Sequence, residues 1–437
     1  MNLKVMKIFG LSLILSIYSS NSSGSNSYEK LFKEYSENGE STFSGEINVY
    51  KSGLPVYKYN SSKYNETYRV GSITKVFTIY IINELISKNK LKLEDKVSDY
   101  IPGLESQIKN AKIIDLLNHT SGLKAVFPKP EYNYSGPEGI SNFINNINID
   151  FDDKKYLYNN FGYMILGLVS ESIERKSWFD IVRTKIIDKY KLKNTGFGKS
   201  SVQGHSLVDG KLTIMDEYPI GYSYSSGSIF SNSSDLVKLV NSLISKKWFK
   251  ALRKDYVDGR HFLGLEVLTS KNIKYFGHKG TLYGFSSSLL FSDNGDCVVS
   301  VLSNVRSIWV HALAVEFFNF CQFEKYDGFY FAKKNIKIPD DMKSSWLGEY
   351  NLSIESNEFI KSIFSDDLKN EISEIIVDIE DDYTLTVSYP RQNEVGKYNT
   401  KDGVVLYNSN DEVFLWKSDD ILHFKSKGIT ITYNKKK

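Results

Sequence analysis

The pattern of hydrophobic and polar positions divides the chain into two unlike parts. Residues 43–50 and 54–59 alternate apolar and polar side chains around a Lys-Ser-Gly turn, which predicts a β-hairpin. Strand-like and helical stretches then follow one another as far as residue 332. From residue 344 onward the chain carries short alternating runs separated by polar turns, so we expect a small antiparallel barrel or sandwich there.

The first 24 residues have the layout of a secretory signal peptide. Lys4 and Lys7 precede an apolar run at residues 8–18, and small polar residues follow at 19–27. The apolar run is shorter than the ~20 residues that a membrane-spanning helix needs, so a retained anchor is the less favoured alternative. We therefore expect a secreted or periplasmic protein.

These patterns predict four segments. A signal peptide at 1–24 precedes a larger domain at 25–332, within which residues 106–193 have helical character throughout. A polar linker at 333–343 then leads to a β-barrel domain at 344–437. With 437 residues, 41% of them hydrophobic, the chain has enough apolar material for two buried cores.

The charge balance excludes some classes of partner. Lys and Arg number 55 and Asp and Glu 52, a net charge of +3, which does not suggest a nucleic acid or an anionic membrane surface as the partner. The six histidines are scattered, and no Cys/His cluster has the spacing of a zinc site. We therefore expect no metal and no cofactor.

The two cysteines leave their redox state open. Cys297 lies in a strand-like run, and Cys321 lies in a helical pattern at 309–323. In an oxidising compartment they form a bridge if this strand packs against this helix. Two buried free thiols are the alternative.

One stretch, residues 68–85, combines the requirements of acyl transfer. An extended run ends at Gly71 and a helix opens with Ser72, so Ser72 and Lys75 lie one turn apart on the same face. A serine hydroxyl needs a base within hydrogen-bond reach, which a lysine with a lowered pKa supplies. The free amides at the start of a helix suit a developing oxyanion. Ser72 is therefore the candidate nucleophile and Lys75 its base.

The Ser-x-x-Lys spacing alone is a weak signal. It also occurs at Ser27/Lys30, Ser87/Lys90, Ser106/Lys109 and Ser121/Lys124. The structural alternative is a serine that caps a helix, followed by a solvated lysine. Only the copy at Ser72 follows a strand-like segment closed by glycine and precedes a long apolar helix, which favours this copy as the reactive one.

Residues 116–123 add a second recognisable stretch. They read Leu-Leu-Asn-His-Thr-Ser-Gly-Leu and follow both the Gly-Ser-x-x-Lys helix and the run Lys-Leu-Glu-Asp-Lys-Val at 92–97. Together these stretches resemble the serine β-lactamase-related superfamily, in particular its branch of class C β-lactamases, D-alanyl-D-alanine carboxypeptidases, D-aminopeptidases and family VIII esterases. The resemblance implies an α/β (α+β) fold, in which helices flank an antiparallel sheet and residues 106–193 form an all-α subdomain. In such proteins the run around His119 is a structural landmark.

The second element of the family, Tyr-x-Asn, is matched by Tyr158-Asn159-Asn160. It leads into a helix at 161–169 that is apolar nearly all round. Tyr158 serves as a base only if a cation such as Lys75 favours its phenolate form. The resemblance implies that Asn160 orients Lys75 or holds a substrate amide. A buried tyrosine that is hydrogen-bonded for packing is the alternative.

The third element, His-x-Gly, is matched by His278-Lys279-Gly280, in a strand expected to be the sheet edge that lines the cleft. Gly280 lets the backbone approach a substrate closely. The resemblance implies that the amides of Ser72 and Thr281 form an oxyanion hole. The imidazole is expected to place a cation or a hydrogen bond near the catalytic tyrosine.

Lys279 departs from the family pattern. Many relatives have a hydroxyl residue there that binds the substrate carboxylate, so the lysine argues against efficient β-lactam hydrolysis. As a substrate-binding residue, Lys279 would face the cleft. Strand alternation leaves open the opposite orientation, in which the lysine is only a solvated charge.

Two later stretches also resemble parts of this family. Residues 224–236 match a glycine-rich loop and helix cap, in which Asp235 is a first-turn acid rather than a catalytic one. Leu-Gly-Glu-Tyr at 347–350 resembles the opening of a lipocalin-like domain appended to some relatives. No catalytic constellation follows it.

These observations predict a secreted serine hydrolase that acts on a peptide or an ester through an acyl-enzyme, with a small-molecule or peptide substrate as its partner. The predicted catalytic residues are Ser72, Lys75 and Tyr158, and the predicted substrate contacts are Asn160, His278, Lys279 and Gly280. A class C-like β-lactamase is the alternative within the family. A non-catalytic penicillin- or peptide-binding protein that keeps the cleft is the alternative of another class.

Overall fold

The computed structural model describes most of the chain between residues 27 and 436. The ranges described are 27–33, 35–36, 43–62, 64–102, 107–123, 158–208, 211–216, 220–254, 261–262, 264–270, 273–307, 309–324, 338, 340–353, 374–379, 384–389, 392–400, 403–407, 412–418, 420–426 and 429–436. The predicted signal peptide, most of the predicted linker and residues 124–157 of the helical region lie outside these ranges. No helix within them is long and apolar enough to cross a membrane.

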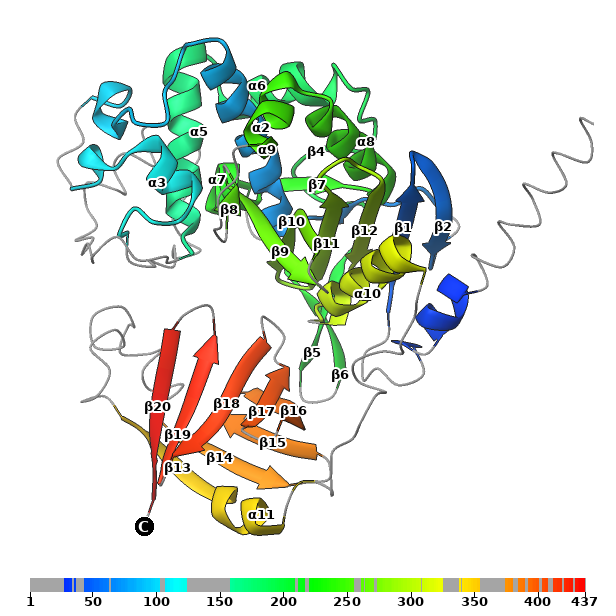
Figure 1. The fold of residues 1–437 in the computed structure, drawn as a ribbon, viewed down its shortest axis with the longest axis vertical. Helices are drawn as coiled ribbons and strands as arrows, with labels where there is room; N and C mark the ends of the chain where they lie inside the picture. Colours follow the sequence, from blue (N-terminus) through cyan, green and yellow to red (C-terminus); the bar gives the residue numbers. More distant parts are fainter. Residues whose placement is uncertain are drawn as a thin grey trace, which may run out of the picture.

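A seven-stranded antiparallel sheet forms the centre of the larger domain (Figure 1). Its order is β2-β1-β12-β11-β10-β9-β8, so the predicted first hairpin is confirmed and lies beside the last strand of this domain. The inner strands β11 and β12 are buried on both faces, because helices cover the sheet on both sides. The strands are β1 (Gly45–Lys51), β2 (Leu54–Asn60), β8 (His261–Phe262), β9 (Leu265–Ser270), β10 (Ile273–Leu282), β11 (Phe285–Ser292) and β12 (Cys297–Ser303).

Helix α10 (Trp309–Phe323) and the helical residues near position 30 cover one face of this sheet. Phe317 of α10 and Val301 of β12 are fully buried in the core cluster between them. A disulfide between Cys297 on β12 and Cys321 on α10 joins the two layers, with Cα atoms 6.1 Å apart. Of the two alternatives left open by the sequence, the structure has the bridge.

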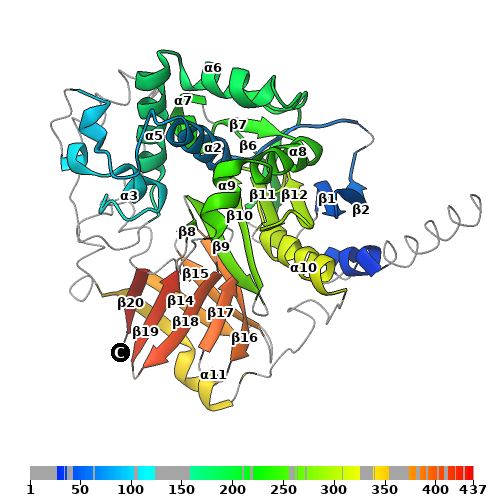
Figure 2. The ribbon, with the colours of Figure 1, turned by 45° about the horizontal axis from the view of Figure 1, so that its top comes forward.

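Helices α2 and α8 pack on the opposite face, and further helices lie beyond them (Figure 2). Because α2 runs between the sheet and these helices, every one of its residues from Thr74 to Asn83 is buried. In the described parts of residues 106–193, most residues lie in helices or turns, and Lys112 forms an isolated β-bridge with Lys96. The helices are α2 (Thr74–Ser87), α3 (Ile113–Leu117), α5 (Asn160–Glu174), α6 (Trp178–Val182), α7 (Ile220–Gly227), α8 (Ser233–Ile244) and α9 (Lys247–Lys254), with the shorter helical turns η1 (Gly71–Ile73), η2 (Val97–Asp99), η3 (Gln107–Asn110) and η4 (Arg183–Ile187).

A small sheet positions the segment that leads into residue 72. Its order is β3-β7-β4, with β3 at Tyr68–Arg69, β7 at Ile229–Ser231 and β4 at Gly196–Phe197. The backbone N–H of Val70 also donates to the carbonyl of Ile229, at 3.1 Å. The chain therefore enters η1 from a fixed direction.

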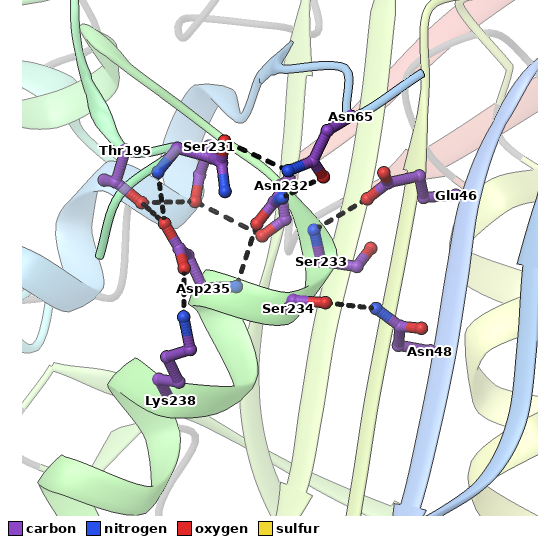
Figure 3. Close-up of polar contacts among 11 residues, drawn as sticks. Glu46, Asn48, Asn65, Thr195, Ser231, Asn232, Ser233, Ser234, Asp235 and Lys238 are labelled. Carbon is purple, nitrogen blue, oxygen red and sulfur yellow. Dashed lines mark hydrogen bonds and ion pairs between the residues drawn. The ribbon is translucent and has the colours of Figure 1, made fainter. Parts of the chain in front are cut away.

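Polar contacts at the start of α8 tie this small sheet to the helix (Figure 3). Asn232 caps α8 by accepting a hydrogen bond from the backbone N–H of Asp235, at 2.9 Å. Asp235 in turn accepts from the N–H of Asn194 at 2.7 Å and pairs with Lys238 at 2.8 Å. The prediction that Asp235 is a first-turn acid with a structural role is confirmed.

Strand β10 differs from its prediction as the edge of the sheet. Residues 273–277 pair with β9 on one side, whereas the pairing with β11 on the other side continues to Leu282. In the described part of the chain, the half of β10 that carries residues 278–282 therefore has no strand partner on the β9 side. The hairpin of β5 (Gly204–Val208) and β6 (Lys211–Met215) was not predicted, and its apolar residues Leu212 and Ile214 are exposed.

The C-terminal strands form a closed antiparallel barrel, which Figures 1 and 2 show as a separate body. Alternation along β14 is visible in its burial, since Ile375 and Val377 are buried and Ile376 is exposed. Strand β16 was not predicted, because its sequence is largely polar and its place comes from pairing with both neighbours. The strands are β13 (Gly348–Leu352), β14 (Glu374–Ile379), β15 (Thr384–Tyr389), β16 (Gln392–Thr400), β17 (Gly403–Tyr407), β18 (Glu412–Ser418), β19 (Ile421–Ser426) and β20 (Ile429–Lys435).

The end of the predicted linker is helical. Residues 340–343 open helix α11 (Asp340–Trp346), in which Lys343 pairs with Asp340 at 3.5 Å. Trp346 is only 4% exposed and anchors this helix by burying its ring. The polar composition of residues 340–343 did not indicate this short helix, whose last residue is buried.

Candidate active site

Ser72 lies at the junction of the small sheet and α2, within the 3₁₀ turn η1. The predicted α-helix begins at Thr74 rather than at Ser72, but the turn keeps Ser72 one turn before Lys75. Gly71 has a φ of +50°, and a methyl group at this position would lie 2.9 Å from the backbone nitrogen of Thr281. Glycine is therefore needed for β10 to approach the turn that carries Ser72.

Lys75 is completely buried and is directed at Ser72. Its Nζ lies 2.9 Å from Ser72 Oγ, 2.7 Å from Asn160 Oδ1 and 3.0 Å from the carbonyl oxygen of Ser226. The two carbonyl oxygens can only accept hydrogen bonds. A neutral amine that donates its two protons to them turns its lone pair toward the serine hydroxyl, which is the orientation a general base needs.

Tyr158 approaches the same hydroxyl from the other side. Its phenol oxygen is 2.8 Å from Ser72 Oγ, and Lys75 Nζ lies 4.9 Å from the centre of its ring. The geometry brings Lys75 and Tyr158 to the hydroxyl oxygen of Ser72, and Asn160 to the amine of Lys75. A cation beside the phenol favours its ionised form, so the arrangement suits proton exchange among the three groups.

The ring of His119 packs against the ring of Tyr158. Its ring lies 4.5 Å from that of Tyr158, and its Nδ1 accepts the backbone N–H of Asn159 at 3.0 Å. The side chain of Asn159 caps α5 by accepting the N–H groups of Phe161 and Gly162. His119 thus contacts Tyr158 and the backbone that follows it, which fits its interpretation as a structural landmark.

His278 lies on β10 across from Tyr158, with ring centres 6.1 Å apart, and is almost fully buried. Its Nδ1 is 2.6 Å from the carbonyl oxygen of Lys279, which only accepts, so Nδ1 carries a proton. Its Nε2 lies 3.9 Å from a carboxylate oxygen of Glu266. The imidazole therefore lies between the ring of Tyr158 and the Glu266 carboxylate.

Gly280 lets β10 run against the segment before the serine. A methyl group on Gly280 would lie 2.0 Å from the carbonyl oxygen of Val70 and 2.4 Å from Ser287 Oγ. Together with the contact between Gly71 and Thr281, this packing brings the backbones of Ser72 and Thr281 close to each other. These are the two residues whose amides were predicted to form the oxyanion hole.

The register of β10 supports the alternative orientation of Lys279. Lys279 is paired with Ser288, whose hydroxyl lies 3.0 Å from Nδ1 of His311 on α10. Gly280 is paired with Ser287, whose hydroxyl donates to the carbonyl of Val70, just before the turn that carries Ser72. Directly opposed residues share a face, so the side chain of Lys279 starts on the α10 side of the sheet.

The sequence did not point to Ser226, whose carbonyl oxygen is one of the partners of Lys75. A backbone acceptor is available from any residue type, so no sequence signal identifies it. Within the described ranges, no group of three potential metal-ligating side chains lies close enough together to hold a metal ion.

The fold and the arrangement of Ser72, Lys75 and Tyr158 define a protein of the β-lactamase-like class of serine hydrolases. The chain belongs to the Beta-lactamase family, whose sequence model matches residues 41–309.

The similar proteins include enzymes of D-amino acid chemistry. Teichoic acid D-alanine hydrolase of Staphylococcus aureus (strain MRSA252) is 27% identical over 226 residues, which are 48% of this chain and 56% of that protein. The chain thus spans little more than half the length of this relative.

Solved structures share the fold. A penicillin-binding protein homologue from Pyrococcus abyssi has a TM-score of 0.61 at 17% identity and covers 93% of this chain and 99% of its own. FmtA from Staphylococcus aureus has a TM-score of 0.58 at 21% identity, with 69% and 87% covered. The D-amino acid amidase from Ochrobactrum anthropi SV3, complexed with D-phenylalanine, has 0.56 at 17%, with 69% and 99% covered.

Proposed function

We propose that this protein is a secreted serine hydrolase that removes a D-amino acid, such as D-alanine, from an ester or amide linkage through an acyl-enzyme on Ser72. The observation that carries the proposal is the double contact on one oxygen. Lys75 Nζ and the Tyr158 hydroxyl lie 2.9 and 2.8 Å from Ser72 Oγ, so a base and a second proton carrier are both within reach.

The chemistry follows from these contacts. Ser72 Oγ bonds to the substrate carbonyl carbon while its proton passes to the neutral amine of Lys75. The bond to the leaving group breaks as that group takes the proton of Tyr158, and Lys75 returns a proton to the phenolate. Water then attacks the acyl-enzyme by the reverse proton path, which releases the acid and restores Ser72. The amides of Ser72 and Thr281 stabilise the oxyanion in both halves.

The choice of substrate rests on the relatives and on the site. Two of the similar proteins are named for D-alanine or D-amino acid substrates. Asn160 and His278 are proposed to position the substrate, and Gly280 to admit it beside β10. Lys279 is omitted from these contacts because of its register. A β-lactam is the second candidate substrate, favoured by the family to which residues 41–309 belong.

The remaining parts of the chain have supporting roles in this proposal. The disulfide between Cys297 and Cys321 is typical of an oxidising compartment, which supports secretion by the predicted signal peptide. The barrel, which we take to be lipocalin-like from its opening Leu-Gly-Glu-Tyr, is proposed to pack near the cleft and narrow it.

The test is covalent labelling followed by turnover. Purified protein is treated with a fluorophosphonate and with a fluorescent penicillin, and the added mass is mapped by peptide mass spectrometry. We expect label on Ser72, none in Ser72→Ala, and native labelling in Ser87→Ala, which alters an exposed serine of another Ser-x-x-Lys copy.

Turnover then identifies the substrate class. D-alanyl esters and amides are expected to be cleaved faster than their L counterparts, and nitrocefin to be a poor substrate. Faster cleavage of nitrocefin would replace the proposal by a β-lactamase. An unlabelled Ser72 with no turnover would make the protein a binding module.

A further inference from the structure

Tyr224 has a backbone conformation that is unusual for any residue with a side chain. It lies within α7 and divides that helix by a kink, with φ +36° and ψ −127°. Its side chain is only 1% exposed. A bulky residue keeps such a conformation only when its surroundings hold it there.

The side chain of Tyr224 is held by α5 and α6. Its hydroxyl donates to a carboxylate oxygen of Glu171, and the same oxygen accepts the backbone N–H of Trp178 at 2.5 Å. The Tyr224 ring packs against the rings of Trp178 and Phe179, with centres 5.7 and 5.1 Å away. Asp180 is a second carboxylate whose negative charge raises the pKa of Tyr224. One hydrogen bond and two ring contacts therefore hold the Tyr224 side chain at the kink, and the bond from Trp178 fixes the Glu171 oxygen that accepts its hydroxyl.

Glu171 is a buried carboxyl group that the proposed chemistry does not use. It is 6% exposed and lies on α5, the helix whose first residue is Asn160. Burial raises its pKa above the usual value, although the hydrogen bonds from Tyr224 and Trp178 oppose this effect. A buried carboxyl is costly to keep, so its place needs a structural or functional reason.

The residues that follow the kink contact α2. The carbonyl of Ser225 accepts the hydroxyl of Thr78 at 2.7 Å, and the carbonyl of Ser226 accepts Lys75 Nζ at 3.0 Å. Both figures of the fold show α7 beside α5 (Figures 1 and 2). These two carbonyl groups belong to the second and third peptide groups after the Cα of Tyr224, so their direction depends on the dihedral angles at Tyr224 together with those at Ser225 and Ser226.

We propose that Glu171 and Tyr224 are positioning residues that hold the Ser226 carbonyl against Lys75 and thereby aim the lysine lone pair at Ser72. Neither side chain touches the substrate. The inference rests on the proposed function, since it assigns a task to the pair only if Lys75 is the base. It explains why a strained tyrosine and a buried carboxyl group lie behind the lysine.

The test compares three variants with the native protein. Tyr224→Phe removes the hydroxyl and keeps the ring packing. Glu171→Gln keeps a carbonyl oxygen that accepts the same two hydrogen bonds. Tyr80→Phe is the matched control, because it removes another buried phenol whose hydroxyl lies 2.5 Å from that of Tyr190 and contacts none of the catalytic groups.

The readouts are the rate of fluorophosphonate acylation at Ser72 as a function of pH, and the melting temperature. We expect acylation by Tyr224→Phe to slow ~10- to 100-fold, the loss typical of a misplaced general base. The acidic limb of the pH–rate profile of this variant should move to lower pH. The reason is that a displaced Ser226 carbonyl stabilises the ammonium form of Lys75 less, which lowers the pKa of the lysine. Tyr80→Phe should acylate at nearly the native rate with the native pH profile, and Glu171→Gln should slow acylation less than Tyr224→Phe does, because its amide oxygen still accepts both hydrogen bonds.

A purely structural role would lower the melting temperature of Tyr224→Phe without moving the pH profile, and this result would overturn the inference alone. Native acylation by Tyr224→Phe would do the same. Failure of the native protein to label at Ser72 would instead overturn the proposed function and the inference with it.

Discussion

Asn160 Oδ1 accepts a hydrogen bond from Lys75 Nζ at 2.7 Å, across 85 residues of sequence. The two residues belong to different helices, α5 and α2, that pack side by side. The side chain of Asn159 caps α5, so the side chain of Asn160 is available to accept the hydrogen bond from Lys75.

Replacing Asn160 with alanine should therefore impair chemistry more than stability. Without this acceptor the amine of Lys75 is no longer held toward Ser72, and a small misplacement of a catalytic group costs up to about 100-fold in rate, so acylation of Ser72 should slow ~10- to 100-fold. The measurement is the rate of fluorophosphonate labelling, with the melting temperature as the control for folding. A native labelling rate in a folded Asn160→Ala variant would contradict the orienting role.

Tyr158→Phe removes the only phenol oxygen that contacts Ser72 Oγ among the described residues. We expect kcat/KM to fall ~10²- to 10⁴-fold, the range for losing a general acid or base, with little change in KM. Tyr163→Phe is the matched control, since its hydroxyl donates to the carbonyl of Leu117 and not to the serine. Equal losses in both variants would show that the tyrosines matter for packing only.

Gly280→Ala should distort the site through the backbone. The added methyl group would lie 2.0 Å from the carbonyl oxygen of Val70, so β10 or the segment before Ser72 must move. We expect ~1–3 kcal/mol of lost unfolding free energy in urea, as for overpacking, together with slower acylation. Gly53→Ala is the control. Its φ of +77° strains any residue with a side chain, but no atom lies within 4 Å of the added methyl group. That control should lose stability and keep acylation.

A buried and a partly buried carboxyl group should respond to pH in opposite directions. Burial would raise the pKa of Glu174, but hydrogen bonds from Lys185 and Lys90 outweigh it and lower the pKa. This stabilisation is present above the ordinary pKa of about 4.3 and is lost as the pH falls through the folded value. Burial raises the pKa of Glu46, although the hydrogen bond from the backbone N–H of Ser233 opposes this shift. A raised pKa changes stability in the opposite direction, so the stability contributed by Glu46 falls as the pH rises above about 4.3.

Urea unfolding between about pH 3 and pH 7 checks both directions. Glu174→Gln should flatten the loss of stability on the acid side, whereas Glu46→Gln should reduce the loss as the pH rises. Identical pH slopes in the native protein and both variants would contradict these assignments.

The disulfide between Cys297 and Cys321 should contribute strongly to stability. It closes a loop with a sequence separation of 24, for which chain entropy gives about 3 kcal/mol. The double variant Cys297→Ala/Cys321→Ala should lose about this much unfolding free energy. It should also become insensitive to dithiothreitol, while the native protein loses stability in the reductant. Equal stability with and without the reductant would argue against a role for the bridge.

The sequence by itself determined the local features of this protein. Alternating positions predicted most of the strands, because one face of a strand is buried and the other is not, as along β14. The spacing of Ser72 and Lys75 placed the two groups one turn apart, because that distance is set by helical geometry and by nothing further along the chain.

Tertiary structure determined the features that depend on residues distant in the sequence. The carbonyl oxygen of Ser226 contacts Lys75 across 151 residues of sequence. Because every residue has such an oxygen, the residue type does not reveal this contact. The side of the sheet on which the Lys279 side chain begins follows from pairing with Ser288, not from its own neighbours in sequence. The largely polar strand β16 exists because β15 and β17 offer it hydrogen bonds. In each case the deciding contact is made by a group that is distant in the chain, so only the folded protein contains the information.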